Sequence, residues 1–175
     1  MRIILTGTPG TGKSAVAGEL ATKLGLKLFR ITDIVKQRMR LGRTHEVDLR
    51  KLASILRFLR SERDYIVEGH LACELKLPAD VLIVLRTRPD VLRKRMAKRG
   101  YGKGKIEENL MAEMLDYCTQ RVDSVYKKRA LELDTTRRTA HSSAIALKNA
   151  IMQKKKSIDR VDYSGYLKKH LHVKT

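Results

Sequence analysis

The segment Gly7–Ser14 holds the residues whose types and spacing are most specific for one chemistry. It reads Gly-Thr-Pro-Gly-Thr-Gly-Lys-Ser and matches the pattern GxxxxGK[ST] in full. Glycines let the backbone bend so that successive N–H groups face inward and bind phosphate oxygens, and the start of a following helix adds partial positive charge. The motif therefore predicts a phosphate-binding loop, whose expected contact residues are Gly7, Pro9, Gly10, Thr11, Gly12, Lys13, Ser14 and Ala15.

Lys13 and Ser14 carry the functional side chains of this loop. Lys13 is expected to reach the β- and γ-phosphates of a nucleotide, and the Ser14 hydroxyl to bind magnesium, which prefers hard oxygen ligands. A chance glycine turn is the alternative, but the motif follows an apolar run and opens a helical pattern, as a true phosphate loop does. We therefore predict ATP and Mg²⁺ as cofactors.

Glu68 and His70 follow a second apolar run. A carboxylate at the end of a strand can hold magnesium directly or through water, so Glu68 is the second candidate metal ligand and a candidate catalytic residue. His70 can orient a water or the phosphoryl acceptor, whereas a histidine taken alone is more often structural. Both are kept as candidate catalytic residues together with Lys13.

A strand before the loop and a helix after it are needed to position these residues. Arg2–Thr6 is β-branched and apolar, and Lys13–Leu24 has helical spacing, with Gly25 placed to end the helix. Further strands are expected at Leu26–Ile31, Tyr65–Val67, Val81–Leu85 and Ala130–Leu133. Compact apolar runs are typical of inner strands of a parallel sheet, so we predict a doubly wound α/β fold: a mainly parallel, five-stranded sheet with helices on both faces.

The other helices are expected between and after these strands. Thr32 and Asp33 stand where an N-cap is expected before a helix from Ile34 to about Leu41, and Asp48 opens another helix. The remaining expected helices are Leu71–Leu77, Asp90–Arg99, Ile106 to about Lys128, and Ala140–Gln153.

The short segment Gly100–Gly104 is glycine-rich and basic, so it can move. Arg95 and Arg99 lie beside it and are candidate catalytic residues, because phosphoryl transfer depends on positive charge around the γ-phosphate. An ordinary basic helix face is the alternative for both arginines.

The composition indicates one folded domain with a strongly basic surface. The chain has 175 residues, and 38 Lys and Arg against 19 Asp and Glu give a net charge of +19. Such a charge attracts polyanions, RNA above all, or it is a solvated surface suited to an unusual cell interior. Cys73 and Cys118 form no CxxC pattern, so neither a disulfide framework nor a zinc site is expected. No apolar run is long enough to span a bilayer and no secretory signal is evident, so we expect no membrane association and a cytoplasmic location.

Four segments together resemble the nuclear adenylate kinase family and its archaeal counterparts. They are Thr6–Ser14, Val67–His70, Val84–Thr87 and Arg95–Tyr101. The similarity runs from Arg2 to about Gln153, which would form an adenylate kinase-like domain of residues 1–153, and it leaves the basic tail of residues 154–175 uncovered.

This resemblance implies a phosphate-loop core, a monophosphate-binding segment at about residues 29–52 and a small lid at about residues 98–108. It implies reversible transfer of the ATP γ-phosphoryl group to AMP or another nucleoside monophosphate, with a slow ATPase activity. It also implies a role in maturation of the small ribosomal subunit, through a ribosomal protein of the platform and with rRNA nearby.

Three positions are assigned through the resemblance with departures from the family pattern. The family has Asp-x-His where this chain has Glu68-Gly69-His70. Ordinary adenylate kinases place Thr-Gly-Asp and an arginine at the monophosphate site. This chain has Thr32, Asp33 and Lys36 there, with Arg38 or Arg40 to assist. A lysine offers phosphate a point charge rather than a two-pronged contact. Arg137 falls where the family packs residues against adenine, with an exposed basic loop as the alternative.

Three functions follow as hypotheses. The first is a nucleoside monophosphate kinase, and the second is a ribosome-assembly ATPase that uses the kinase fold as a switch. The third is an RNA- or ribosomal-protein-binding module in which nucleotide only stabilises the fold. A regulatory GTPase is disfavoured, because no NKxD element follows the loop.

Overall fold

A five-stranded, wholly parallel sheet forms the centre of the molecule in the computed structural model, which describes residues 1–39 and 47–172. The strands are β1 (Arg2–Thr6), β2 (Lys27–Arg30), β3 (Tyr65–Glu68), β4 (Val81–Arg86) and β5 (Leu131–Asp134). Their order across the sheet is β2-β3-β1-β4-β5. The prediction of a doubly wound α/β fold is thus confirmed, with every strand pair parallel.

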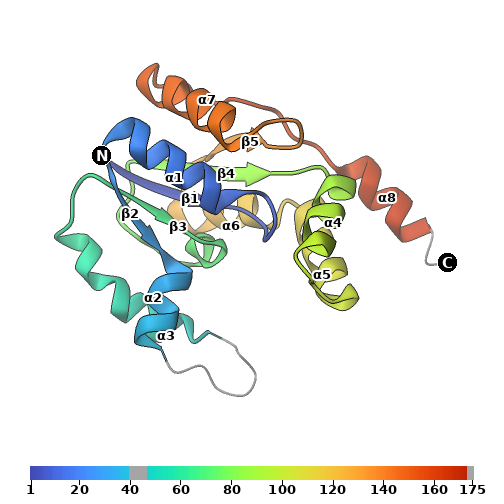
Figure 1. The fold of residues 1–175 in the computed structure, drawn as a ribbon, viewed down its shortest axis with the longest axis horizontal. Coiled ribbons are helices and arrows are strands. Elements are labelled where there is room, and N and C mark those ends of the chain that lie inside the picture. Colours follow the sequence, from blue (N-terminus) through green and yellow to red (C-terminus); the bar gives the residue numbers. More distant parts are fainter. Residues whose placement is uncertain (40–46, 173–175) are drawn as a thin grey trace.

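Helices cover both faces of this sheet (Figure 1). The longer helices are α1 (Lys13–Leu24), α2 (Ile31–Arg38), α3 (Leu49–Ile55), α4 (Pro89–Lys98), α5 (Lys103–Met114), α6 (Tyr117–Tyr126), α7 (Ala140–Met152) and α8 (Ser164–His172). Two short 3-10 helices, η1 (Leu56–Arg60) and η2 (His70–Glu74), flank β3. Among the described residues no helix is long and apolar enough to cross a bilayer.

Alternate residues of each inner strand enter two separate cores. Ile3 and Leu5 of β1 pack with α1 and α7 on one face of the sheet. Ile4, which lies between them, packs on the other face with η1, η2, α2, α3 and α6. Because both faces are covered by apolar side chains, the strands read as continuous apolar runs, as buried parallel strands do.

A third, smaller core joins α4, α5 and the C-terminal tail. Leu92, Met96, Leu110 and Met114 of the two helices surround the buried ring of Tyr163, which directly precedes α8. In Figure 1, α8 lies beside α4 and α5 at the end of the molecule away from the N-terminus. The basic tail therefore docks on the domain through an apolar contact.

Two predicted helix boundaries are wrong. The helix expected from Ile34 begins at Ile31 in direct continuation of β2, with Arg30 at the cap position and no side-chain cap, so Thr32 and Asp33 lie inside α2. It begins early because Ile31 is buried against Gly69. The helix expected over Ile106 to Lys128 is instead two helices, because Asp116 takes a left-handed conformation between α5 and α6.

The starts of α5 and α3 also bear on the predictions. α5 begins at Lys103, inside the segment expected to be a flexible glycine-rich break, which leaves only Arg99–Gly102 between α4 and α5. The prediction that Asp48 opens a helix is confirmed, because its carboxylate accepts from the backbone N–H groups of Arg50 and Lys51 at 2.8 and 3.1 Å. The end expected near Leu41 lies outside the described residues.

Candidate active site

The phosphate loop connects β1 to α1 at the carboxyl edge of the sheet. Gly12 has φ 90°, and a Cβ atom added there would meet nothing within 4 Å, so the loop opens onto free space at this point. The first turn of α1 has neither a side-chain cap nor an acidic residue. Its N–H groups are therefore free to bind an anion, as the motif predicts.

Lys13 is held inside the loop that it belongs to. Its ammonium group donates to the Thr8 carbonyl at 3.0 Å, and the residue is only 8% exposed. Burial lowers the pKa of Lys13, while the nearby charge of Glu68 opposes that shift. A partly desolvated cation at the base of a phosphate loop interacts strongly with an anion that replaces the carbonyl as its partner.

Ser14 and Glu68 converge from α1 and β3. The Ser14 hydroxyl donates to a Glu68 carboxylate oxygen at 3.3 Å, and Glu68 is 4% exposed. Burial raises the pKa of this carboxyl group, and Lys13 and the Ser14 hydrogen bond counteract the rise. Leu5 lies opposite Glu68 in the pairing of β1 with β3, which brings the carboxylate beside the start of the loop.

This pair of oxygen ligands fits magnesium rather than a metal held wholly by protein. Within the described part of the chain, no three His, Cys, Asp or Glu side chains gather where they could hold a metal. Magnesium usually takes one or two protein oxygens and completes its shell with phosphates and water. Ser14 and Glu68 are the residues that would hold it, and the ion would there screen the phosphate charge.

Gly69 lets α2 approach the end of β3. A Cβ atom at this position would lie 2.9 Å from the Cβ of Ile31, so only glycine fits without a shift of the helix. The contact brings α2 next to the Glu68–His70 segment. The same contact explains why the middle residue of Glu68-Gly69-His70 is glycine, which the sequence alone does not explain.

His70 begins η2 and is accessible to solvent. Partial burial of the imidazole among protein atoms and the positive charges of Lys13 and Lys105 nevertheless lower its pKa to about 4. The ring is therefore neutral near pH 7, with one nitrogen able to accept a hydrogen bond and the other able to donate one.

A hollow of about 480 Å³ lies beside the loop. Six of the predicted site residues line it: Gly10, Thr11, Gly12, Ala15, Arg95 and Arg99. Gly7, Pro9, Lys13 and Ser14 lie in the same loop but do not line this hollow. The structure thus brings together the loop, Arg95 of α4 and Arg99, which directly follows α4.

The two arginines differ in how firmly they are held. Arg95 donates to the Thr135 carbonyl at 2.8 Å and to the Thr87 and Thr135 hydroxyls at 3.2 and 3.1 Å. Burial and the neighbouring Arg99 lower its pKa. Arg99 is exposed at the end of α4 and makes no side-chain hydrogen bond or salt bridge to the described residues. Arg95 is therefore a fixed cation and Arg99 a free one.

Arg137, which was expected to contact adenine, lies in an adjoining hollow with Arg88, Thr136 and Arg160. Its neighbour Arg138 lines both that hollow and the one beside the loop. Ser143 of α7, whose hydroxyl is buried and has no hydrogen-bond partner among the described residues, also lines the hollow beside the loop. No motif or spacing in the sequence distinguishes Arg138 or Ser143 as a site residue.

The three residues predicted to bind the monophosphate, Thr32, Asp33 and Lys36, are exposed on α2. Asp33 lies near enough to Glu68 for its charge to raise the pKa of that carboxyl group. Arg40, named as an assisting residue, lies outside the described part of the chain. The structure therefore places one end of α2 next to the Ser14–Glu68 pair.

A buried ion pair contacts the phosphate loop through Thr8, and no pattern in the sequence predicts it. The Glu113 carboxylate accepts from the Thr8 hydroxyl at 2.5 Å, from Arg86 Nε at 2.9 Å and from the Thr87 N–H at 2.9 Å. Arg86 and Glu113 are each 1% exposed. Glu113 thus joins the phosphate loop, the end of β4 and α5 through one side chain.

The Arg86 guanidinium has further partners. It pairs with Asp116 and lies 3.5 Å from Glu132. Burial lowers the pKa of Arg86, but the charges of Glu113, Asp116 and Glu132 outweigh the burial and raise it. The guanidinium carbon also lies 5.2 Å from the centre of the Tyr163 ring. Through Arg86 the C-terminal tail contacts the network that holds Thr8.

These features define a P-loop nucleotide-binding protein with the fold of small kinases: a phosphate loop between β1 and α1, and a carboxylate at the end of the neighbouring strand. The chain belongs to the AAA domain family, whose model matches residues 3–116, and to the family of its archaeal relatives named "Putative adenylate kinase".

Two of these relatives align over nearly the full chain. The protein from Methanothermobacter thermautotrophicus is 38% identical over 173 residues, covering 94% of this chain and 98% of its own. The protein from Methanocaldococcus jannaschii is 34% identical over 171 residues, covering 94% of this chain and 93% of its own.

Solved structures show the same fold at low identity. Shikimate kinase from Acinetobacter baumannii is 18% identical with a TM-score of 0.67, covering 88% of this chain and 94% of its own. Deoxyadenosine kinase from M. mycoides is 18% identical with a TM-score of 0.62, covering 87% of this chain and 100% of its own. At such identity the likeness concerns the fold alone.

Proposed function

We propose that this protein is a nucleoside monophosphate kinase of the adenylate kinase type, which uses ATP and Mg²⁺ and phosphorylates AMP or another nucleoside monophosphate. The observation that carries the proposal is the convergence of Lys13, Ser14 and Glu68 at an uncapped helix start. The names of the archaeal relatives support the same activity.

Transfer breaks the bond from the γ-phosphorus to the β–γ bridging oxygen and forms a bond to an oxygen of the acceptor's phosphate. The N–H groups of the loop and of α1 bind the donor phosphates. Lys13 exchanges the Thr8 carbonyl for a phosphate oxygen, and Arg95 and Arg99 stabilise the charge that spreads over the transferred group. Ser14 and Glu68 would hold a magnesium ion, which would supply positive charge to the phosphates.

The acceptor site is proposed on α2, within a monophosphate-binding segment of about residues 29–52. Thr32, Asp33 and Lys36 are exposed there, and Asp33 lies near enough to Glu68 for its charge to act on that carboxyl group. The neutral imidazole of His70 orients the acceptor, or a water molecule when no acceptor is bound, which would produce a slow ATPase activity. The α4–α5 corner, within about residues 98–108, acts as the lid that carries Arg99. Arg137 contacts the nucleoside of ATP.

We propose that the protein works in the cytoplasm. The test therefore measures, at cytoplasmic pH, the ADP and inorganic phosphate formed from ATP and Mg²⁺, with and without AMP. We expect ADP formation that requires AMP and releases no free phosphate, with activity lost in Lys13→Ala. Lys23→Ala, on the same helix but outside the loop, is the matched control and should keep its activity. Release of inorganic phosphate at the same rate with and without AMP would show that the acceptor is water.

A second role is favoured by the net charge of +19, which exceeds what a nucleotide site needs. We propose that the protein also acts in maturation of the small ribosomal subunit, as an ATPase of the nuclear adenylate kinase type that binds rRNA and a ribosomal protein of the platform. Purified platform protein or an rRNA fragment should then increase the rate of phosphate release without AMP. An unchanged rate with both would contradict this role.

A further inference from the structure

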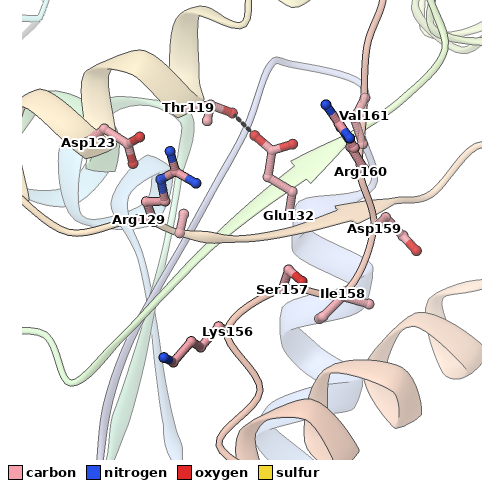
Figure 2. Close-up of a pocket in the computed structure, with 11 residues that line it drawn as sticks. Thr119, Asp123, Arg129, Glu132, Lys156, Ser157, Ile158, Asp159, Arg160 and Val161 are labelled. Carbon is pink, nitrogen blue, oxygen red and sulfur yellow. Dashed lines mark hydrogen bonds between the residues drawn. The ribbon is translucent and has the colours of Figure 1, made fainter.

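Residues 154–161 of the tail border a groove along the edge of the sheet, away from the phosphate loop. In Figure 2 the tail residues Lys156 to Val161 lie on one side of a hollow, and Thr119, Asp123 and Arg129 of the α6–β5 region lie on the other. This hollow has a volume of about 580 Å³. A second hollow of about 620 Å³ shares the lining residues Arg129, Lys156 and Ser157 with it, so the two adjoin. We call this pair of hollows the tail groove.

The rim of the tail groove is cationic. Arg129, Lys154, Lys155, Lys156 and Arg160 line it, and all five are exposed. None of them forms a salt bridge or a side-chain hydrogen bond with another residue in ranges 1–39 and 47–172. Their charges are therefore available to a ligand.

Most acidic groups in the tail groove are already neutralised. Asp159 pairs with Arg138, Asp80 with Arg2, and Glu132 accepts from Thr119 at 2.6 Å and lies 3.5 Å from Arg86. Asp123 is the acidic lining residue without such a partner in the described structure. Among the described residues, five unpaired cations against one unpaired carboxylate leave the groove strongly positive.

Apolar residues of β4, β5, α7 and the tail also line the tail groove, beside polar residues such as Thr119 and Glu132. Leu82 and Leu131 line one end, beside Ile151, and Ile158 and Val161 line the other. Apolar lining residues next to exposed cations suit a ligand with a regular anionic backbone and flat apolar faces. A single-stranded nucleic acid has both, whereas an acidic peptide has neither the same charge density nor flat bases.

We propose that the tail groove binds single-stranded RNA, with Lys154, Lys155, Lys156, Arg129 and Arg160 on its phosphates. This inference rests on the second proposed role and gives it a surface. The groove continues toward the nucleotide, because Asp159 and Arg160 also line the hollow that contains Arg137, and Arg138 links that hollow to the phosphate loop. Bound RNA would therefore lie next to the nucleotide site without occupying it.

The test compares two variants that each lose three positive charges. Lys154→Gln/Lys155→Gln/Lys156→Gln removes cations from the groove. Arg57→Gln/Arg60→Gln/Arg63→Gln removes exposed cations from the segment that leads into β3, next to the opposite edge strand β2. Fluorescence anisotropy of a labelled 12-nucleotide oligouridylate is measured from 50 to 200 mM KCl, and AMP phosphorylation is measured in parallel.

Five phosphate contacts predict that the wild-type affinity falls roughly 100-fold across this salt range, and two remaining contacts predict a fall of roughly 7-fold for the groove variant. In the control variant, RNA affinity should depend on salt as steeply as in the wild-type protein. The groove variant should keep its phosphotransferase activity. Equal losses in the two variants would overturn the groove while leaving RNA binding in place.

Two other outcomes would overturn the proposal in different ways. No binding of oligouridylate by the wild-type protein would remove both the groove and the RNA-linked role, without touching the kinase activity measured in the same samples. Displacement of the RNA by poly-glutamate as effectively as by unlabelled RNA, at equal charge, would assign the groove to acidic protein segments instead.

Discussion

Replacement of Glu113 by glutamine tests the buried ion pair below the phosphate loop. Glutamine keeps the shape of the side chain: its carbonyl can accept from Arg86 Nε and the Thr87 N–H, and its amide can donate to the Thr8 hydroxyl. The substitution therefore removes one negative charge and leaves the number of hydrogen bonds nearly unchanged.

The expected loss follows from the burial of both partners. Removing one partner of a buried pair typically costs about 3 to 5 kcal/mol. Arg86 keeps Asp116 and lies 3.5 Å from Glu132, so we expect the low end, about 3 kcal/mol of the free energy of unfolding. For a chain of this length that loss corresponds to a fall in Tm of about 6 to 12 °C.

Urea denaturation followed by circular dichroism measures this loss, and Glu108→Gln on the same helix is the control. Glu108 pairs with Lys105 at the exposed surface, so its replacement should cost less than about 0.5 kcal/mol. ATP affinity should also fall in Glu113→Gln, because Thr8 loses a charged acceptor. A loss of stability below about 1 kcal/mol would refute the view that Arg86 depends on Glu113.

Three further predictions follow from the site and its supports. The His70 imidazole should titrate near pH 4 in an NMR experiment and at a higher pH in Lys13→Met, because Lys13 contributes to lowering its pKa. The unfolded His70 ring binds a proton near pH 6.5, and the folded ring binds one only near pH 4. The contribution of His70 to the free energy of unfolding should therefore fall as the pH drops from 6.5 to 4. A titration midpoint of the folded ring near 6.5 would contradict the site geometry. Gly69→Ala should destabilise the protein by about 1 to 3 kcal/mol in urea denaturation, because its Cβ would press on Ile31; a neutral effect would show that α2 moves freely. Asp48→Ala should cost about 1 kcal/mol through the loss of the α3 cap, whereas Asp48→Asn should restore most of it.

The sequence was sufficient for those parts of the fold and site whose signals are local. Gly7–Ser14 predicts the loop, the strand before it and the helix after it, because each glycine and the Lys-Ser pair have fixed positions in the motif. The buried strands follow from their continuous apolar runs. The Asp48 cap follows from one side chain and the two N–H groups that come directly after it.

The remaining features depend on contacts between residues far apart in the chain. The expected single helix from Ile106 breaks at Asp116, whose carboxylate pairs with Arg86 thirty positions earlier. α2 begins at Ile31 because Gly69 makes room for it. Glu113 lay in a predicted helix as one acidic residue among several, and no spacing in the sequence connects it to Thr8.

The contact of the tail with β5 has a consequence for solubility. β5 is an edge strand, and an open edge exposes backbone groups to which another chain can add a strand. Asp159 covers this edge: its N–H donates to the Glu132 carbonyl at 3.2 Å, and its carboxylate accepts from the Asp134 N–H at 2.8 Å. A protein shortened to residues 1–153 would lose this cover, and it should self-associate through β5 even where its nucleotide site stays folded.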